Sequence, residues 1–252
     1  MNNINELTNY IQKSNNIVVF SGAGISVASG INSFRGNNGL YITDNFEGMS
    51  PENILCRQTL KKNPRLVLRF YKHRLLSIAD KQPNKAHLAL KKLQDIGKLK
   101  AIVTQNIDDL HNKAGNTNVY ELHGNIKQYK CNGGMCPRTY NHEEFLSKLD
   151  KEEVPKCDCG FSIIRPNVVL FDEWLNENVF DNALREIQKA DLLIAIGSSL
   201  VVMPACSLVN ETSPYCKKVL INNQPTQFDK KFDLVINEDC GDVLDTAVNN
   251  LT

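Results

Sequence analysis

The chain has 252 residues, of which 42% are hydrophobic and 23% charged, and its formal net charge is +1. This length can bury a full core as one large domain, or as one domain with a small insert. The near-neutral charge gives no electrostatic reason to expect a nucleic acid or an anionic membrane as partner, and the polar N-terminus and the absence of a long apolar run favour a cytoplasmic protein.

Strand and helix patterns alternate along most of the chain, which is typical of a parallel sheet covered by helices. A short opening helix is expected around Leu7, followed by a buried strand at residues 17–20. Asn63 and Pro64 predict a helix N-terminus, and that helix should run to about Ile78.

The second half of the chain continues the same alternation. A helix should begin near Asn84 and end at Gly97, where glycine favours a helix C-terminus. The later expected elements are strands at 100–103, 192–196, 219–221 and 234–236, with an amphipathic helix around 180–187.

The segment from about 127 to 165 interrupts this pattern, because it is polar and contains glycine turn signals and a cluster of cysteines. We therefore expect a single domain over residues 1–252 with an α/β fold. Its doubly wound, Rossmann-like parallel sheet would come from about 1–126 and 166–252, with a small metal-binding insert at about 127–165.

Four of the eight cysteines lie in this insert, namely Cys131, Cys136, Cys157 and Cys159. In a reducing compartment such a cluster indicates a metal site before disulfides. The spacings are C-x₄-C and C-x-C, and the second is tight because one intervening residue restricts how both sulfurs can reach one ion.

A glycine-rich segment, GAGISVASGINSFRG at residues 22–36, directly follows the first buried strand. Small residues at this point let backbone N–H groups approach a phosphate closely. The segment nearly matches the dinucleotide fingerprint G-x-G-x-x-G, but Val27 stands where the third glycine belongs. The segment therefore indicates a nucleotide, and the missing third glycine argues against an ordinary dehydrogenase.

Small or amide-bearing residues also follow three other expected strands, at 104–115, 197–205 and 222–224. In a doubly wound sheet, ligands bind beyond the carboxyl ends of the strands. Together with the glycine-rich segment, these loops predict one site for a sugar–phosphate ligand.

The motifs GAGIS, SGI-x-x-FRG, TQNID, LHG, RPNVVLFDE and GSSL resemble those of sirtuins, a family of NAD-dependent protein-lysine deacylases, and the resemblance covers about residues 17–244. It implies that NAD is a co-substrate whose pyrophosphate lies on the glycine-rich segment. The residues that it implies for NAD binding are Gly22, Ala23, Gly24, Ser26, Phe34, Arg35, Gln105, Asn106, Ile107, Asp108, Gly197, Ser198, Asn222 and Cys240.

The resemblance also implies the chemistry. The acyl-lysine oxygen attacks C1′ of the nicotinamide ribose, nicotinamide leaves, and the acyl group ends on ADP-ribose. His123 is the implied general base and Asn106 the second catalytic residue, and imidazole suits a base step near neutral pH. Val169, Leu170 and Phe171 would wall the tunnel for the substrate lysine, and the peptide would add as an extended strand.

In this family the four clustered cysteines hold a structural Zn²⁺, so the resemblance implies zinc on Cys131, Cys136, Cys157 and Cys159. The partners implied are acyl-lysine proteins or peptides, without nucleic acid or membrane.

Tyr71 and Arg74 lie three positions apart on an expected helix and hence on one face. Sirtuins that remove succinyl or malonyl groups carry Tyr-x-x-Arg here, and the arginine pairs with the acyl carboxylate. A core tyrosine beside a rim arginine is equally ordinary on an amphipathic helix. The hypothesis is therefore deacetylation, with acidic acyl groups also accepted.

Two alternatives stay open on sequence. One is a mono-ADP-ribosyltransferase or an NAD hydrolase, since both break the same C1′–N bond. The other is a non-catalytic NAD-responsive binding module, which the presence of both His123 and Asn106 disfavours.

Overall fold

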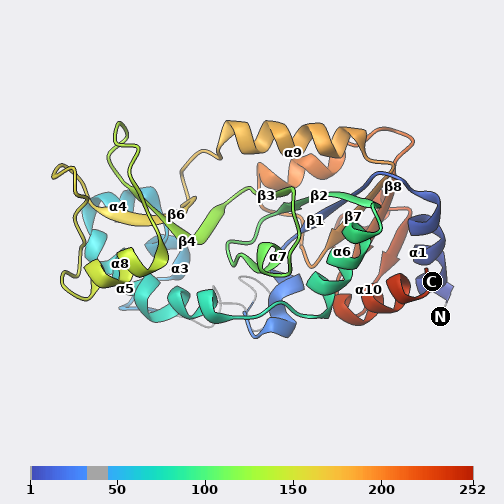
Figure 1. Cartoon of the computed structure of the whole chain (residues 1–252), viewed down its shortest axis with the longest axis horizontal. Helices are drawn as coiled ribbons and strands as arrows, with labels where there is room; N and C mark the ends of the chain where they lie inside the picture. The colour runs from blue at the N-terminus through green and yellow to red at the C-terminus, as the bar shows by residue number, and fades with distance from the viewer. Residues whose placement is uncertain (1, 33–44, 252) are drawn as a thin grey trace.

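The computed structural model describes residues 2–32 and 45–251. Its central feature is a six-stranded parallel sheet in the order β3-β2-β1-β7-β8-β9 (Figure 1). The two middle strands, β1 and β7, are buried along their whole length, as expected of a sheet that is covered on both faces. The strands span Ile17–Ser21 (β1), Leu99–Thr104 (β2), Val119–Glu121 (β3), Leu192–Ile196 (β7), Lys217–Ile221 (β8) and Leu234–Ile236 (β9).

Helices cover both faces of this sheet, which confirms the expected doubly wound α/β fold. On one face lie α1 (Asn2–Lys13), α6 (Lys85–Asp95) and α10 (Cys240–Asn249). On the other lie α9 (Glu177–Lys189) and the 3₁₀ helix η4 (Ala205–Asn210). The short helices η1 (Ala23–Ser29), α7 (Leu110–Lys113) and η5 (Asp229–Lys231) lie in loops around the sheet. No helix within the described ranges is long and apolar enough to cross a membrane.

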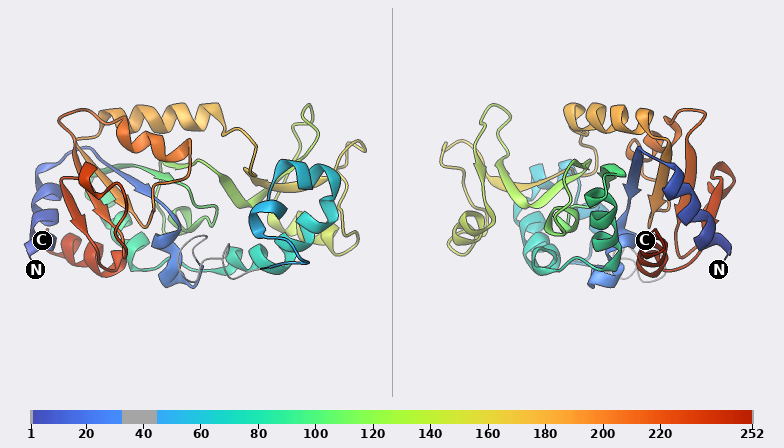
Figure 2. Two further views of the ribbon diagram at one scale, coloured as in Figure 1. Left: turned by 180° about the vertical axis from the view of Figure 1, so that it is seen from behind. Right: turned by 45° about the vertical axis from the view of Figure 1, so that its right-hand side comes forward.

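A smaller lobe lies beside the parallel sheet, and α1 and α10 lie together at the opposite end of the molecule (Figures 1 and 2). The three-stranded sheet of the smaller lobe has the order β5-β4-β6, and both pairings are antiparallel. The strands span Gly124–Cys131 (β4), Thr139–Tyr140 (β5) and Ile164–Val168 (β6), and α8 (His142–Leu149) follows β5.

Three short helices from an earlier part of the chain belong to the same lobe (Figure 2), namely α3 (Pro51–Ile54), α4 (Arg57–Lys62) and α5 (Pro64–Phe70). Leu68 of α5 packs in one apolar cluster with Tyr129 and Phe145. The lobe therefore combines two separate stretches of sequence. The boundaries of 127–165 expected for the insert stay a prediction.

Local capping explains where two helices begin. The side chain of Asn63 accepts a hydrogen bond from the Leu66 N–H at 3.2 Å, and that of Asn84 accepts one from the Ala86 N–H at 3.0 Å. Both expected helix starts are therefore confirmed. Gly97, at the expected end of α6, has φ +75°.

The helix expected from Pro64 to about Ile78 is wrong in its second half. It is α-helical only to Phe70, after which residues Tyr71–Leu75 form a π-helical turn (η2) and Leu76–Asp80 a 3₁₀ turn (η3). Single π turns occur inside helices, often at functional sites, and apolar periodicity does not reveal them.

Candidate functional site

A cavity of about 630 Å³ opens at the carboxyl edge of the parallel sheet. Loops that follow β1, β2, β7 and β8 all contribute to its walls. β1 and β7 lie side by side at the point where the strand order reverses, and that crevice is where open α/β sheets bind ligands. Fold topology therefore places the cavity where a nucleotide is expected.

The glycines on this edge are required by the close approach of two backbone segments. A Cβ on Gly22 would lie 2.8 Å from the carbonyl oxygen of Gly197, and a Cβ on Gly24 would lie 2.6 Å from the Gly197 Cα. Gly197 itself has φ +58°, a conformation that glycine favours. The turn after β1 and the turn after β7 thus touch through backbone atoms. Two hydrogen bonds also join them, because the Gly22 N–H donates to the Ile196 carbonyl at 2.9 Å and the Gly24 N–H donates to the Gly197 carbonyl at 2.8 Å.

A buried polar network fixes the loop that follows β2. Asn106 donates from Nδ2 to the Gly22 carbonyl at 3.1 Å and to Ser26 Oγ at 3.2 Å. Ser26 Oγ donates to Asp108 Oδ2 at 2.6 Å, and the Leu110 N–H donates to Asp108 Oδ1. Burial raises the pKa of Asp108, while the bonds from Ser26 and Leu110 oppose that rise.

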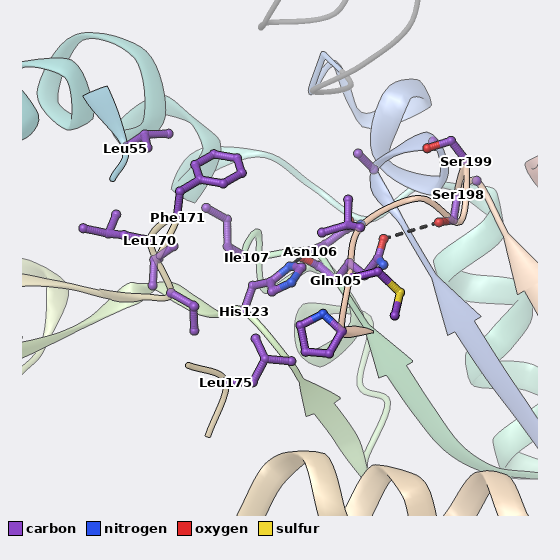
Figure 3. A pocket seen from close by; sticks show the side chains of 18 of the residues that line it. Leu55, Gln105, Asn106, Ile107, His123, Leu170, Phe171, Leu175, Ser198 and Ser199 are labelled. Carbon is purple, nitrogen blue, oxygen red and sulfur yellow. Dashed lines mark hydrogen bonds between the residues drawn. The ribbon is translucent and has the colours of Figure 1, made fainter. Parts of the chain in front are cut away.

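His123 lies at the middle of the cavity, between Leu170 and Phe171 on one side and Ser198 on the other (Figure 3). Its Nδ1 is 2.8 Å from the carbonyl oxygen of Gln105. A carbonyl only accepts, so Nδ1 carries the proton and Nε2 presents a lone pair. Burial lowers the pKa of His123, and the Gln105 contact partly offsets this, so the ring is neutral near pH 7 and can act as a base.

Gln105 offers a direct test of whether the cavity fits a polar ligand. Its Oε1 accepts a hydrogen bond from Ser198 Oγ at 3.3 Å, drawn as a dashed line in Figure 3. Its Nε2 is buried, and no partner for it exists among the described residues. A buried donor without a partner is costly, so a ligand oxygen such as a ribose hydroxyl would fit there.

The half of the cavity toward the small lobe is apolar. Figure 3 shows Leu55, Leu170 and Phe171 grouped on this side, with Ile107 next to His123. Such a lining suits an alkyl chain with a small acyl group at its end.

The cavity collects most of the predicted binding residues from segments far apart in the sequence. Those that line it are Ala23, Gly24, Tyr71, Gln105, Asn106, Ile107, His123, Val169, Leu170, Phe171, Gly197, Ser198, Asn222 and Cys240. Gly22, Ser26 and Asp108 lie just behind its wall, in the contacts described above. Phe34 and Arg35 lie outside the described residues.

Arg74 is not among the described residues that line the cavity, although Tyr71 is. Tyr71 is buried, whereas Arg74 is exposed and its guanidinium lies 5.8 Å from the centre of the Phe46 ring. Tyr71 therefore lines the described cavity, whereas Arg74 does not. A π turn holds more residues than the 3.6 of an α-helix, so positions three apart diverge around the axis.

Sequence reasoning missed several apolar residues of the wall, among them Val27, Leu55, Leu75 and Leu175. Leu55 follows the last residue of α3, a short helix that the periodicity does not indicate. No local signal separates these side chains from ordinary core residues, since only the packing of whole elements brings them around one cavity.

The four clustered cysteines meet at one point of the small lobe. The sulfurs of Cys131, Cys136, Cys157 and Cys159 all lie within 4.8 Å of one another, and none forms a disulfide. Four thiolates at such separations fit a tetrahedral Zn²⁺, which thiolate ligands favour. Zinc bound here would join the β4–β5 hairpin to the loop before β6, with no part in the reaction.

Together the fold and the cavity define a dinucleotide-binding protein with a Rossmann-like sheet and a separate thiolate metal site. Comparison with known proteins is consistent with this. The profile of the Sir2 family matches residues 22–204.

The chain is similar to relatives of the same length. An NAD-dependent protein deacetylase of Clostridium perfringens is 45% identical over 247 residues, which cover 98% of each chain. An NAD-dependent protein deacylase 2 of Archaeoglobus fulgidus is 37% identical, covering 98% of this chain and 96% of the relative.

Two solved structures share the fold. One is a Sir2 variant with a deacetylated p53 peptide and 3′-O-acetyl ADP ribose, at a TM-score of 0.89 and 36% identity over 98% of each chain. The other is Sir2 with a p53 peptide and NAD⁺, at a TM-score of 0.85 and 35% identity over 98% of each chain. The chain belongs to the Sir2 family.

Proposed function

We propose that this protein is an NAD-dependent protein-lysine deacetylase. It would take NAD and an acyl-lysine protein as substrates and release nicotinamide, O-acyl-ADP-ribose and free lysine. The observation that carries this proposal is the position of His123, a neutral imidazole between a glycine-lined polar half and an apolar half of one cavity. The deacetylase and deacylase names of full-length relatives support it.

In this proposal NAD is a substrate, whose ribose carbon receives the acyl oxygen as nicotinamide leaves. Gly24 and Gly197 keep this edge of the cavity free of side chains, so the pyrophosphate can lie close to the backbone. Gln105 and Asn106 face the ribose, and the network of Ser26 and Asp108 holds their loop against the glycine-rich turn. Nε2 of His123 then takes a proton from a ribose hydroxyl, which makes that oxygen nucleophilic toward the acyl carbon.

For the acyl group, we propose a preference for acetyl and other short uncharged chains. No Arg or Lys occurs among the described residues that line the cavity, and Arg74 lies over Phe46 at the surface. Among the described residues of the cavity wall, a buried acyl carboxylate would therefore meet no cation to pair with. In an assay with matched acetyl and succinyl peptides, Arg74→Met should leave the ratio of the two rates as in the wild type. A selective loss of desuccinylation would instead restore the carboxylate-pairing hypothesis.

A mass-spectrometric assay tests the proposed function. The protein is incubated with NAD and an acetyl-lysine peptide, and we expect deacetylated peptide and O-acetyl-ADP-ribose in equal amounts. ADP-ribosylated protein without O-acetyl-ADP-ribose would indicate a transferase, and free ADP-ribose without deacetylation an NAD hydrolase.

The His123→Ala variant should bind NAD as the wild type does but lose turnover. His73→Ala, which changes an exposed histidine outside the described cavity wall, is the matched control and should retain it. Turnover in His123→Ala equal to that of the control would remove the assigned base.

We also propose a cytoplasmic location. None of the eight cysteines forms a disulfide, and a four-thiolate metal site is favoured where thiols stay reduced. Immunodetection of the protein in fractionated cells tests this directly.

A further inference from the structure

The C-x-C half of the metal site requires a tight turn. Two cysteines separated by one residue must bring their sulfurs to one ion, and here a turn does so. The Gly160 N–H donates to the Cys157 carbonyl at 2.9 Å, and Gly160 has φ +79°. Asp158, the residue between the two ligands, lies at the centre of this turn.

A tyrosine from another element holds this turn on both sides. The Tyr140 hydroxyl donates to Cys157 Sγ at 3.1 Å. The same oxygen accepts the backbone N–H of Asp158 at 3.0 Å. One hydroxyl thus fixes a ligand sulfur and the peptide that follows it, and each bond polarises the other.

Tyr140 is itself rigidly placed. It lies in β5, pairs with Tyr129 of β4 and is only 8% exposed. Lys148 of α8 covers its ring at 5.7 Å and donates to Asp158 Oδ1 at 2.6 Å. The turn is therefore held at Asp158 twice, because Tyr140 binds the backbone N–H of this residue and Lys148 binds its side chain.

In each half of the metal site, a ligand sulfur accepts a hydrogen bond from a nearby N–H or O–H group. In the C-x₄-C half, the Gly133 N–H donates to Cys131 Sγ at 3.3 Å. In the C-x-C half, the Tyr140 hydroxyl donates to Cys157 Sγ. Four thiolates around one Zn²⁺ carry excess negative charge, and hydrogen bonds to sulfur stabilise it.

We propose that Tyr140 is a positioning residue of the structural zinc site, whose hydroxyl holds Cys157 and the Cys157–Gly160 turn in ligating geometry and so slows zinc release. The inference rests on the zinc site assigned above to the four cysteines. It accounts for how a spacing that is tight for a zinc knuckle can still hold the ion.

Zinc transfer from the full-length protein to an excess of a chromogenic chelator tests the proposal. Outer-sphere partners of metal ligands typically contribute about 10–100-fold to metal affinity. We therefore expect Tyr140→Phe, which keeps the ring, to release zinc at least about tenfold faster than the wild type. In cobalt-substituted protein, Tyr140→Phe should also shift the thiolate-to-cobalt absorption band, which a mere loss of packing would leave in place.

Two variants serve as controls. Tyr215→Phe removes a hydroxyl from a tyrosine that is 93% exposed and should leave zinc release unchanged. Asp158→Asn weakens the contact with Lys148 but keeps the backbone N–H that Tyr140 accepts, so its effect should be much smaller than that of Tyr140→Phe.

Equal release rates in Tyr140→Phe and the wild type would overturn the role of Tyr140, whereas less than one zinc in the purified wild type would overturn the zinc assignment. If Tyr140→Phe does not fold, amide exchange of the wild type decides the question. The Asp158 amide should then be protected, and its rapid exchange would refute the contact.

Discussion

The contact between the two glycine turns predicts an effect of Gly24→Ala on both stability and NAD binding. The added Cβ would lie 2.6 Å from the Gly197 Cα and 2.8 Å from its carbonyl oxygen, which are backbone atoms that cannot rotate away. The turn after β1 must therefore shift from the turn after β7. Such overpacking lowers the free energy of unfolding by about 1–3 kcal/mol. About 0.4–1 kcal/mol of this is offset, because alanine has less conformational freedom than glycine in the unfolded chain.

Two other glycines separate steric crowding from the effect of backbone conformation. A Cβ added at Gly134 would meet no atom within 4 Å, and the φ of Gly134 is not positive, so Gly134→Ala should change the free energy of unfolding by less than about 0.5 kcal/mol. Gly97 has φ +75°, but a Cβ added there would also meet no atom within 4 Å. Gly97→Ala should therefore lower the free energy of unfolding by about 1–2 kcal/mol, because alanine disfavours this backbone conformation.

Urea unfolding and calorimetric titration with NAD provide the two measurements. Because Gly24 lines the cavity, we expect Gly24→Ala to weaken NAD binding at least about tenfold, which corresponds to about 1.4 kcal/mol. Gly97→Ala and Gly134→Ala should bind NAD as the wild type does. If Gly24→Ala matches Gly134→Ala in both measurements, the close backbone approach does not shape the NAD site.

Two further predictions concern pH. Burial lowers the pKa of His123, so the acid limb of the kcat/KM profile should lie below the ordinary histidine pKa of about 6.5. An acid limb above pH 7 would contradict the assigned protonation state. His123→Ala should lower kcat by roughly 10²–10⁴-fold. Burial raises the pKa of Glu121 from 4.5 to about 7, so its contribution to stability is present below pH 4.5 and lost as the pH rises through 7. At pH 8, Glu121→Gln should therefore be more stable than the wild type by up to about 3 kcal/mol, whereas at pH 4 the two should be equally stable. Urea unfolding at both pH values measures this. If the carboxyl were well solvated, the two proteins would show no such difference.

Much of the fold was predictable because its signals are local. The buried run at residues 17–20, the small residues after it and the caps at Asn63 and Asn84 each depend on neighbours within a few positions. The cysteine cluster also stood out, since its four members occur within 29 residues, from Cys131 to Cys159. Periodicity could not reveal the π turn at Tyr71–Leu75, and this turn decides where Arg74 lies.

The amino-acid sequence alone predicted five of the six strands of the parallel sheet, the glycine-rich turn and the residue types of both sites, because propensity, capping and alternation act over short stretches of chain. Only the tertiary structure decided which of these residues meet. Ser26 bonds to Asp108, and Tyr140 to Cys157, across long stretches of sequence, and Leu55 reaches the cavity from another lobe. Such contacts depend on how whole elements pack against one another, and a local pattern carries no record of that packing.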